Sequence, residues 1–172
     1  MKACTRIGAA HSFRPIRAPC RMHNGFMSGS SITVCQTCGT KNRTPVATTG
    51  KPRCATCGAD LPWLVPADDQ NLTAAIDTSA LVVLDLWAPW CGPCRMVAPV
   101  LERLSKSYAG RIKVVKVNVD ESPRAATIYQ AQSIPTLVLV DKGRVVDRIV
   151  GAQPESVLAS HIDKALVGRV RQ

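Results

Sequence analysis

The sequence predicts an α/β domain with a mixed central sheet over residues 63–170, preceded by a small turn-rich module over residues 32–62 and a basic arm over residues 1–31. Three observations lead to this prediction. From Trp63 onward, apolar runs of strand length alternate with amphipathic stretches of helix length. The module contains many turn formers and little apolar material. The arm shows no periodicity and is rich in Arg, Ser, Gly and Pro, so we expect it to be disordered.

The domain is expected to begin with a short strand, a short helix and a buried strand. Residues 63–65 are apolar and form the first strand. Asp68 or Asp69 then caps a short helix that reaches about Ile76. Residues 81–87 are nearly all apolar and are flanked by turn formers, which is typical of a strand buried on both faces.

A long helix is expected from about Pro93 to Tyr108. Gly110 follows its end. Pro99 lies inside this helix and should kink it by removing one hydrogen bond. The apolar positions on one face of the helix are Val97, Val100, Leu101, Leu104 and Tyr108.

The middle of the domain continues with a strand, a helix and a hairpin. Residues 112–118 alternate apolar side chains inward and form a strand. Residues 122–129 form a short helix. Residues 136–140 and 145–150 are strands, joined by a hairpin across residues 141–144.

The last expected element is a helix that Pro154 opens and Gly168 follows. Its apolar stripe consists of Val157, Leu158, Ile162 and Leu166. The order of the domain is therefore β-α-β-α-β-α-β-β-α. This order predicts a sheet that is parallel at first and antiparallel at the last hairpin, with helices on both faces.

The positive charge is concentrated at the N-terminal end of the chain. The formal net charge is +10. Residues 1–60 hold nine Lys and Arg against the single acid Asp60, whereas residues 61–172 hold thirteen against eleven acids. Such a basic segment can bind nucleic acid or anionic surfaces without specificity. The interpretation we favour is a solvated arm.

No membrane span or secretory signal is expected. The apolar run at residues 80–84 ends at Asp85 and is far shorter than the roughly 20 residues of a spanning helix. Residues 1–26 are basic but lack the apolar stretch of about 7–15 residues that a secretory signal requires. An organelle-targeting arm stays open, as does a later start at Met22 or Met27. With no signal for export, the expected location is the reducing cytoplasm.

Eight cysteines determine the chemistry that the chain can perform. In a cytoplasmic chain, Cys-x-x-Cys spacing favours metal or redox chemistry over a structural disulfide framework. Cys4 and Cys20, with His11 and His23, have no regular ligand spacing, and we expect them to be incidental residues of the arm. The other six cysteines form the pairs Cys35/Cys38, Cys54/Cys57 and Cys91/Cys94.

The sequence Cys91-Gly92-Pro93-Cys94 lies where a buried strand meets the first turn of a helix. Unpaired N–H groups and the helix dipole favour an anion there. The pKa of the Cys91 thiol should therefore fall, which makes its thiolate nucleophilic near neutral pH. Cys94 is close enough to attack a mixed disulfide on Cys91, and Pro93 suits the first helical turn. Zinc binding by this pair and an inert buried pair are the alternatives.

Asp85 interrupts an otherwise apolar strand. Burial should raise the pKa of its carboxyl group. A carboxylate without a partner in a core strand is too costly to be incidental. An ordinary paired acid is the alternative.

The run Asp-Leu-Trp-Ala-Pro-Trp-Cys-Gly-Pro-Cys-Arg at residues 85–95 closely resembles the active-site segment of thioredoxins. The resemblance covers about residues 63–168 and implies the thioredoxin fold. It also implies that the chain reduces disulfides of other proteins by thiol–disulfide exchange. Gly-Pro between the cysteines is the reductase signature of this family. Further matching segments are Lys116-Val117-Asn118-Val119-Asp120, Ile134-Pro135-Thr136, Gly143 and Gly151.

The resemblance implies a role for each site residue. Cys91 would attack and Cys94 would resolve. Asp85 would assist proton transfer to and from Cys94 through water, with Lys116 near it. Pro135 would be cis and would place backbone beside the dithiol for substrate pairing. Substrate docking would involve Trp90, Gly92, Pro93, Ile134 and Gly151.

The resemblance also implies the partners of the chain. They are oxidised protein substrates and a thioredoxin reductase, an NADPH-dependent flavoenzyme that recharges the dithiol. We expect no bound organic cofactor, no membrane and no nucleic acid, and we expect a monomer.

The other two cysteine pairs are separated by fifteen residues, and a glycine follows each pair. This spacing is typical of a four-thiolate zinc site. A metal would also stabilise residues 32–62, which have too little apolar surface to bury. Two local disulfides or an iron centre are the alternatives. The expected ligands of one structural zinc ion are Cys35, Cys38, Cys54 and Cys57.

A zinc ribbon before a thioredoxin domain resembles the zinc-containing bacterial thioredoxins of the thioredoxin 2 type. Residues 1–26 depart from that pattern. Two other function classes stay open. The ribbon could tether the redox domain to nucleic acid or a protein through residues 1–53, which salt-sensitive binding would support. It could also sense oxidation by releasing its metal.

Overall fold

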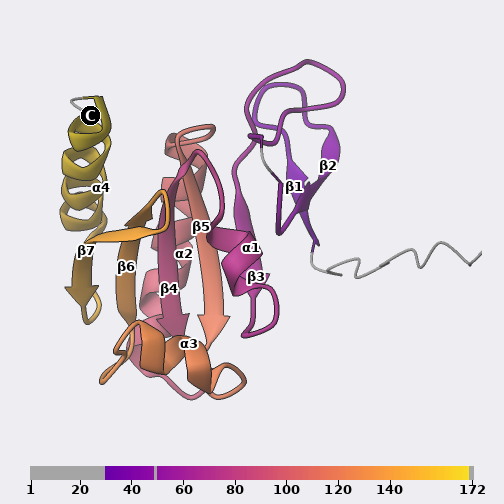
Figure 1. Cartoon of the computed structure of the whole chain (residues 1–172). Helices are drawn as coiled ribbons and strands as arrows, with labels where there is room; N and C mark the ends of the chain where they lie inside the picture. The colour runs from indigo at the N-terminus through magenta and orange to yellow at the C-terminus, as the bar shows by residue number, and fades with distance from the viewer. Residues whose placement is uncertain (1–29, 49, 171–172) are drawn as a thin grey trace, which may run out of the picture.

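The computed structural model describes residues 30–48 and 50–170 (Figure 1). The predictions for Cys4, Cys20, His11 and His23, and for nearly all of the basic arm, lie outside these residues. A small two-stranded sheet stands beside a five-stranded sheet that has helices on both faces (Figure 1). Among the described helices, none has the length and apolar character that crossing a membrane requires.

The order of elements in the larger unit, which runs from Leu64 to Val170, matches the prediction. The strands are β1 (Ser30–Val34), β2 (Lys41–Pro45), β3 (Leu64–Ala67), β4 (Leu81–Trp87), β5 (Ile112–Asn118), β6 (Thr136–Asp141) and β7 (Arg144–Val150). The helices are α1 (Leu72–Ile76), α2 (Gly92–Ser107), α3 (Pro123–Ile128) and α4 (Glu155–Val170).

The larger sheet has the strand order β3-β5-β4-β6-β7. β3 and β4 run parallel to β5, whereas β6 is antiparallel to both β4 and β7. This confirms the predicted mixed sheet. Among the described strands β3 pairs only with β5, and an edge strand tolerates a proline such as Pro66.

Two hydrophobic layers cover the two faces of this sheet. β4 supplies both layers, because successive side chains of a strand point to opposite faces. Leu81 and Val83 pack in the layer that α2 and α4 cover. Val82 and Leu84 pack in the layer that contains residues of α1 and α3. The burial of β4 on both faces confirms its prediction as a buried strand.

The start of α1 differs from the prediction. The carboxylate of Asp68 accepts N–H groups of Gln70 and Asn71 in a turn, so the helix begins later, at Leu72. Asp69 caps a different helix, because its carboxylate accepts the N–H groups of Arg124 and Ala125 at the start of α3. Asp68 therefore stabilises the turn before α1, whereas Asp69 caps α3.

The last helix also differs from the prediction. α4 continues through Gly168 to Val170, so this glycine is not a stop signal. Val157 is exposed, whereas Leu158 and Ile162 are buried against the sheet. α2 contains Pro99 inside one helix, as predicted.

The burial of β5 departs from simple alternation. Its first four residues are all buried, and one of them is Lys113. β5 lies between two other strands and both of its faces are covered. Lys113 is therefore buried even though its side chain is charged.

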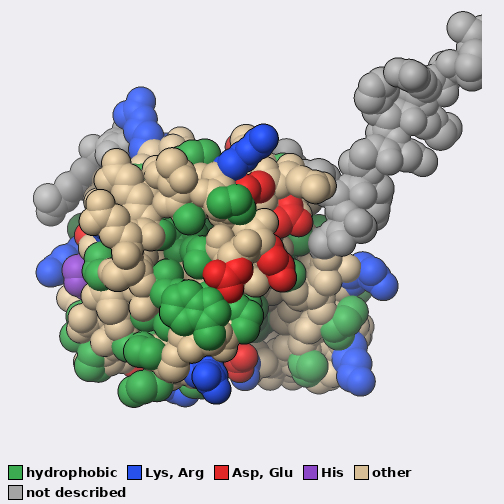
Figure 2. Space-filling view, turned by 90° about the horizontal axis from the view of Figure 1, so that it is seen from below, with side chains coloured by type: hydrophobic (Ala, Val, Ile, Leu, Met, Phe, Trp, Pro, Cys, Tyr) green, Lys and Arg blue, Asp and Glu red, His purple; other side chains and the backbone are tan. Residues whose placement is uncertain are grey.

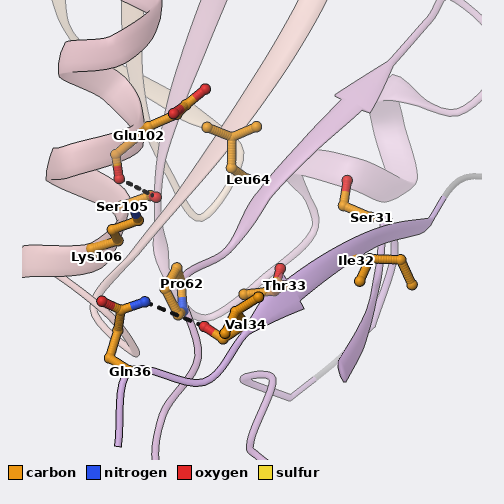
Figure 3. Close-up of a pocket in the computed structure, with 10 residues that line it drawn as sticks. All are labelled: Ser31, Ile32, Thr33, Val34, Gln36, Pro62, Leu64, Glu102, Ser105 and Lys106. Carbon is orange, nitrogen blue, oxygen red and sulfur yellow. Dashed lines mark hydrogen bonds between the residues drawn. The ribbon is translucent and has the colours of Figure 1, made fainter. Parts of the chain in front are cut away.

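The N-terminal module contains the antiparallel hairpin of β1 and β2, with Ser30 opposite Pro45 and Val34 opposite Lys41. β1 therefore includes Ser30 and Ser31, which the sequence analysis assigned to the arm. An open cleft of about 470 Å³ separates β1 from α2 (Figure 3). The side chains of Ile32 and Val34 line it from β1 and are exposed.

Candidate active site and metal centre

Cys91 and Cys94 lie at the start of α2, directly after β4. Their sulfurs form a disulfide with an S–S distance of 2.01 Å. Cys91 is the N-cap of α2, and its Sγ accepts the backbone N–H of Cys94 at 3.1 Å. Pro93, in the first turn, has no N–H group to satisfy. Both cysteines are buried, with 4% and 5% of their surface exposed.

A short apolar cluster surrounds the disulfide. Ala88 is buried with the two cysteines, and Ile134 packs against them. The Ile134–Pro135 peptide bond is cis, as expected. The Pro135 carbonyl accepts the N–H of Gly151 at 2.8 Å. This bond joins the loop before β6 to the loop after β7. The fold therefore brings together residues that are far apart in the sequence.

Trp90 is the exposed aromatic residue beside the dithiol, with 67% of its surface accessible. Its indole N–H donates to the carboxylate of Asp120 at 2.9 Å. Gly92 and Pro93 are also exposed. Figure 2 shows apolar side chains gathered beside acidic ones on the face seen from below, where α3 lies. The hydrogen bond from Trp90 to Asp120 had no signal in the sequence pattern.

Asp85 is buried in β4, with 3% of its surface exposed. It lies opposite Lys116 in the register of β4 and β5. Its Oδ1 atom has no hydrogen-bond partner among the residues that the structure describes. Burial raises the pKa of this carboxyl group to about 6, and the positive charge of Lys116 opposes the rise. The Lys116 ammonium also lies 4.9 Å from the centre of the Trp87 ring.

A cysteine pair at a helix start and a cis-proline loop thus occur together, directly after a strand that holds a buried carboxyl group. Residues 64–164 match the family model of thioredoxin. The chain belongs to the thioredoxin family. It is therefore a thiol–disulfide oxidoreductase that acts on proteins, as the sequence predicted.

Individual thioredoxins resemble this chain to different extents. The thioredoxin of Synechocystis sp. is 52% identical over 91 residues, which cover 53% of this chain and 85% of that protein. The thioredoxin of Chlorobaculum thiosulfatiphilum is 44% identical over 99 residues, covering 57% and 92%. The chloroplastic thioredoxin M4 of Arabidopsis thaliana is 35% identical over 145 residues, covering 81% and 74%.

Outside the thioredoxin match, the remaining two cysteine pairs meet in the N-terminal module. The sulfurs of Cys35, Cys38, Cys54 and Cys57 all lie within 4.8 Å of one another. Cys35 and Cys57 are 3.6 Å apart, and Cys38 and Cys54 are 3.5 Å apart, measured between sulfurs. Four thiolates around zinc at about 2.3 Å lie about 3.8 Å apart in a tetrahedron. The four sulfurs can therefore hold one metal ion.

The two pairs sit in turns with the same backbone hydrogen bonds. The N–H of Gly39 donates to the Cys35 carbonyl, and the N–H of Gly58 donates to the Cys54 carbonyl. Both glycines have positive φ, at 73° and 72°, a conformation that other residues rarely adopt. This explains why a glycine follows each pair. We call these two turns the first knuckle (residues 35–40) and the second knuckle (residues 54–59).

Asn42 joins the two knuckles. Its side-chain amide N–H groups donate to the Thr40 carbonyl and to the Cys54 sulfur, and its oxygen accepts the N–H of Ala55. The backbone N–H of Cys57 is the main cause that lowers the pKa of Cys54 to about 6. These donors favour a thiolate at Cys54, which suits a metal ligand. Sequence spacing gave no indication of Asn42.

Proposed function

We propose that this thioredoxin is a protein-disulfide reductase in which Cys91 attacks the substrate and Cys94 resolves the intermediate. The observation that supports this proposal most directly is the position of the Cys91 sulfur at the N-cap of α2. The Cys94 N–H points at that sulfur, and the helix dipole favours negative charge at the same place. Both effects stabilise a thiolate at Cys91.

Reduction takes two exchange steps in this proposal. The Cys91 thiolate attacks one sulfur of the substrate disulfide, and the other substrate sulfur leaves as a thiolate. Cys94 then loses its proton and attacks the Cys91 sulfur. The Cys91–Cys94 disulfide forms and the second substrate thiolate leaves. Two electrons thereby pass from the dithiol to the substrate, and the observed disulfide corresponds to the end of this sequence.

Asp85 is the proposed base for the second step. It takes the proton from Cys94 through water and returns it when the dithiol is regenerated. A pKa of about 6 leaves the carboxyl group mostly ionised at pH 7, yet basic enough to accept a proton. Lys116 keeps this pKa from rising further.

The proposed docking surface surrounds Cys91. The backbone of cis-Pro135 pairs with the substrate chain, and apolar contacts come from side chains and glycines at the rim. The exposure of Trp90 and the packing of Ile134 against the cysteines support this assignment. The rim residues are Trp90, Gly92, Pro93, Ile134 and Gly151.

The proposed ligands of one structural zinc ion are Cys35, Cys38, Cys54 and Cys57, as in the thioredoxin 2 type. The distances between sulfurs support zinc. A bound zinc ion would neutralise the thiolates and hold the two knuckles together. We accordingly propose a basic arm over residues 1–31, a zinc ribbon over 32–62 and a thioredoxin domain over 63–170.

Each turnover consumes two electrons, so an external reductant must restore the dithiol. We propose a thioredoxin reductase that draws on NADPH, oxidised cytoplasmic proteins as substrates and a monomeric chain. The family resemblance supports these partners.

The test is reduction of insulin disulfides by the wild type, Cys91→Ser and Cys94→Ser, with NADPH and thioredoxin reductase as the electron source. Metal content is measured on the same samples. We expect loss of turnover in both variants and about one zinc per chain in all three. Turnover by Cys91→Ser equal to that of the wild type would overturn the mechanism, and absence of zinc would overturn the ribbon assignment.

A further inference from the structure

Lys113 is a buried cation without an acidic partner. None of its surface is exposed, and it takes part in none of the ion pairs among the described residues. Burial lowers the pKa of this lysine to about 8, so at pH 7 the ammonium group keeps its proton. A buried charge is costly unless hydrogen bonds compensate it. Its partners therefore show what this lysine does.

The partners of Lys113 come from three separate segments. Its ammonium group donates to the carbonyl of Val46, which follows β2 of the N-terminal module, and to the carbonyl of Ala75 in α1. It also lies 4.1 Å from the centre of the Trp63 ring, a favourable contact between a cation and an aromatic face. Lys113 thus connects β5 to the segment that leaves the hairpin.

The same segment is held by a second bond. The indole N–H of Trp63 donates to the Pro45 carbonyl at 2.9 Å. The side chain of Val46 is buried in the core layer of the larger sheet. Two successive carbonyls, of Pro45 and Val46, are therefore bound by side chains of the thioredoxin domain.

The module touches the domain again beyond the second knuckle. At Gly110, in the turn before β5, an added Cβ would lie 2.3 Å from a carboxylate oxygen of Asp60. Leu61 follows Asp60 and is buried against Cys35 and Cys54, which links this contact to the two knuckles. The second knuckle is therefore part of a segment whose two ends, at residues 45–46 and at Asp60, both contact the domain.

From these contacts we infer that Lys113 is a latch: it holds the cysteine-bearing module on the thioredoxin sheet by binding the Val46 carbonyl. When the module detaches, the ammonium group loses this carbonyl and the core loses Val46. Both contacts therefore oppose detachment of the module from the domain. The inference concerns the docking of the module and does not require that the four cysteines hold a metal.

The test is hydrogen–deuterium exchange of the full chain, read by mass spectrometry on peptides from residues 40–62. Lys113→Met keeps the length and volume of the side chain and removes the charge and the donors. The substitution also removes the cost of burying a charge, so we expect the variant to stay folded. We expect exchange in these peptides to accelerate by about tenfold or more, as for loss of charged hydrogen bonds. Peptides from β4 and β6 should keep their protection.

Two further variants complete the test. Trp63→Phe keeps the aromatic ring and removes the bond to Pro45, so a smaller acceleration of about fivefold is expected in the same peptides. Lys164→Met changes an exposed lysine of α4 and should leave them unchanged. If exchange at residues 40–62 in Lys113→Met equals that of the wild type, the latch is wrong. The same series is then repeated on protein treated with a chelator, which separates the zinc ribbon from the latch. If residues 40–62 of the chelator-treated wild type exchange at the same rate as before, the zinc ribbon is contradicted and the latch is not.

Discussion

Asp85 of β4 and Lys116 of β5 lie opposite each other in a parallel register, on the sheet face that α2 covers. The carboxyl group is buried and the lysine is half-buried. Burial raises the pKa of Asp85 to about 6, and the lysine charge limits that rise. The pair therefore places an acid that can exchange protons near neutral pH inside the sheet, on the face that α2 covers.

Asp85→Asn should stabilise the protein at pH 7. The folded state binds the Asp85 proton more tightly than the unfolded state, whose pKa stays near the ordinary value of 3.8. Ionisation therefore opposes folding, and the free energy of unfolding falls as pH rises from about 4 to 6. The substitution removes a penalty of about 3 kcal/mol at pH 7 and almost none at pH 4.

Urea unfolding at pH 4 and pH 7 measures this difference. Glu121→Gln, at an exposed position, is the control and should change stability little at either pH. A variant Asp85→Asn with no gain at pH 7 would show that the carboxyl group is not held in the environment described above.

Lys116→Met should raise the pKa of Asp85 above 6, because the positive charge that opposes the effect of burial is lost. A carbon-13 titration of the Asp85 carboxyl group measures the pKa directly. Lys106→Met, at an exposed position of α2, serves as control and should leave it unchanged. A lower pKa in Lys116→Met would contradict the electrostatic role of this lysine.

Cys94→Ser should accumulate a mixed disulfide with an oxidised substrate, because Cys91 can still attack and nothing resolves the product. Cys91→Ser should not form such an adduct. Intact-mass measurement after reaction with a disulfide-bonded peptide separates the two. The assignment of attacking and resolving residues is reversed if the adduct forms on Cys91→Ser instead.

Asn42→Ala should weaken metal binding by about tenfold or more, because the amide that donates to Cys54 and joins the two knuckles is lost. Competition with a chromophoric chelator gives the affinity. Lys41→Ala changes the exposed neighbour in β2 and should bind metal like the wild type. Equal affinity in Asn42→Ala would mean that the sulfurs alone determine binding.

Gly110→Ala should destabilise the protein, whereas Gly168→Ala should not. Gly110 has a φ of 73°, which costs other residues about 1–2 kcal/mol, and a Cβ there would displace Asp60. Gly168 lies inside α4 with open space around it, so alanine should gain about 1 kcal/mol of helix stability. Thermal unfolding of both variants gives the comparison, and a neutral Gly110→Ala would contradict the close approach of Asp60.

Much of the fold was predictable because its signals are local. The bounds of β4 and β5 agree with the prediction to the residue, since β4 is a dense apolar run between turn formers and β5 shows the alternation of a strand. The cysteine spacing and the following glycines predicted the cluster of four sulfurs, because each knuckle is a complete local turn.

The features that sequence reasoning missed depend on contacts between distant segments. Asp69 looks like the cap of the next helix, yet it caps α3, which begins more than fifty residues later. Lys113 and Asn42 are polar residues whose burial depends on carbonyls and a sulfur from other elements. No local pattern distinguishes such residues from solvated ones.

Pro66 has a consequence for how the protein behaves at high concentration. An edge strand offers a row of free N–H and C=O groups to which another chain can add. A proline in β3 interrupts that row, because it has no N–H group to donate. At the opposite edge β7 carries Arg144, Asp147 and Arg148, whose charges disfavour stacking of like strands. Both edges of the sheet thus carry features that disfavour the addition of a further strand.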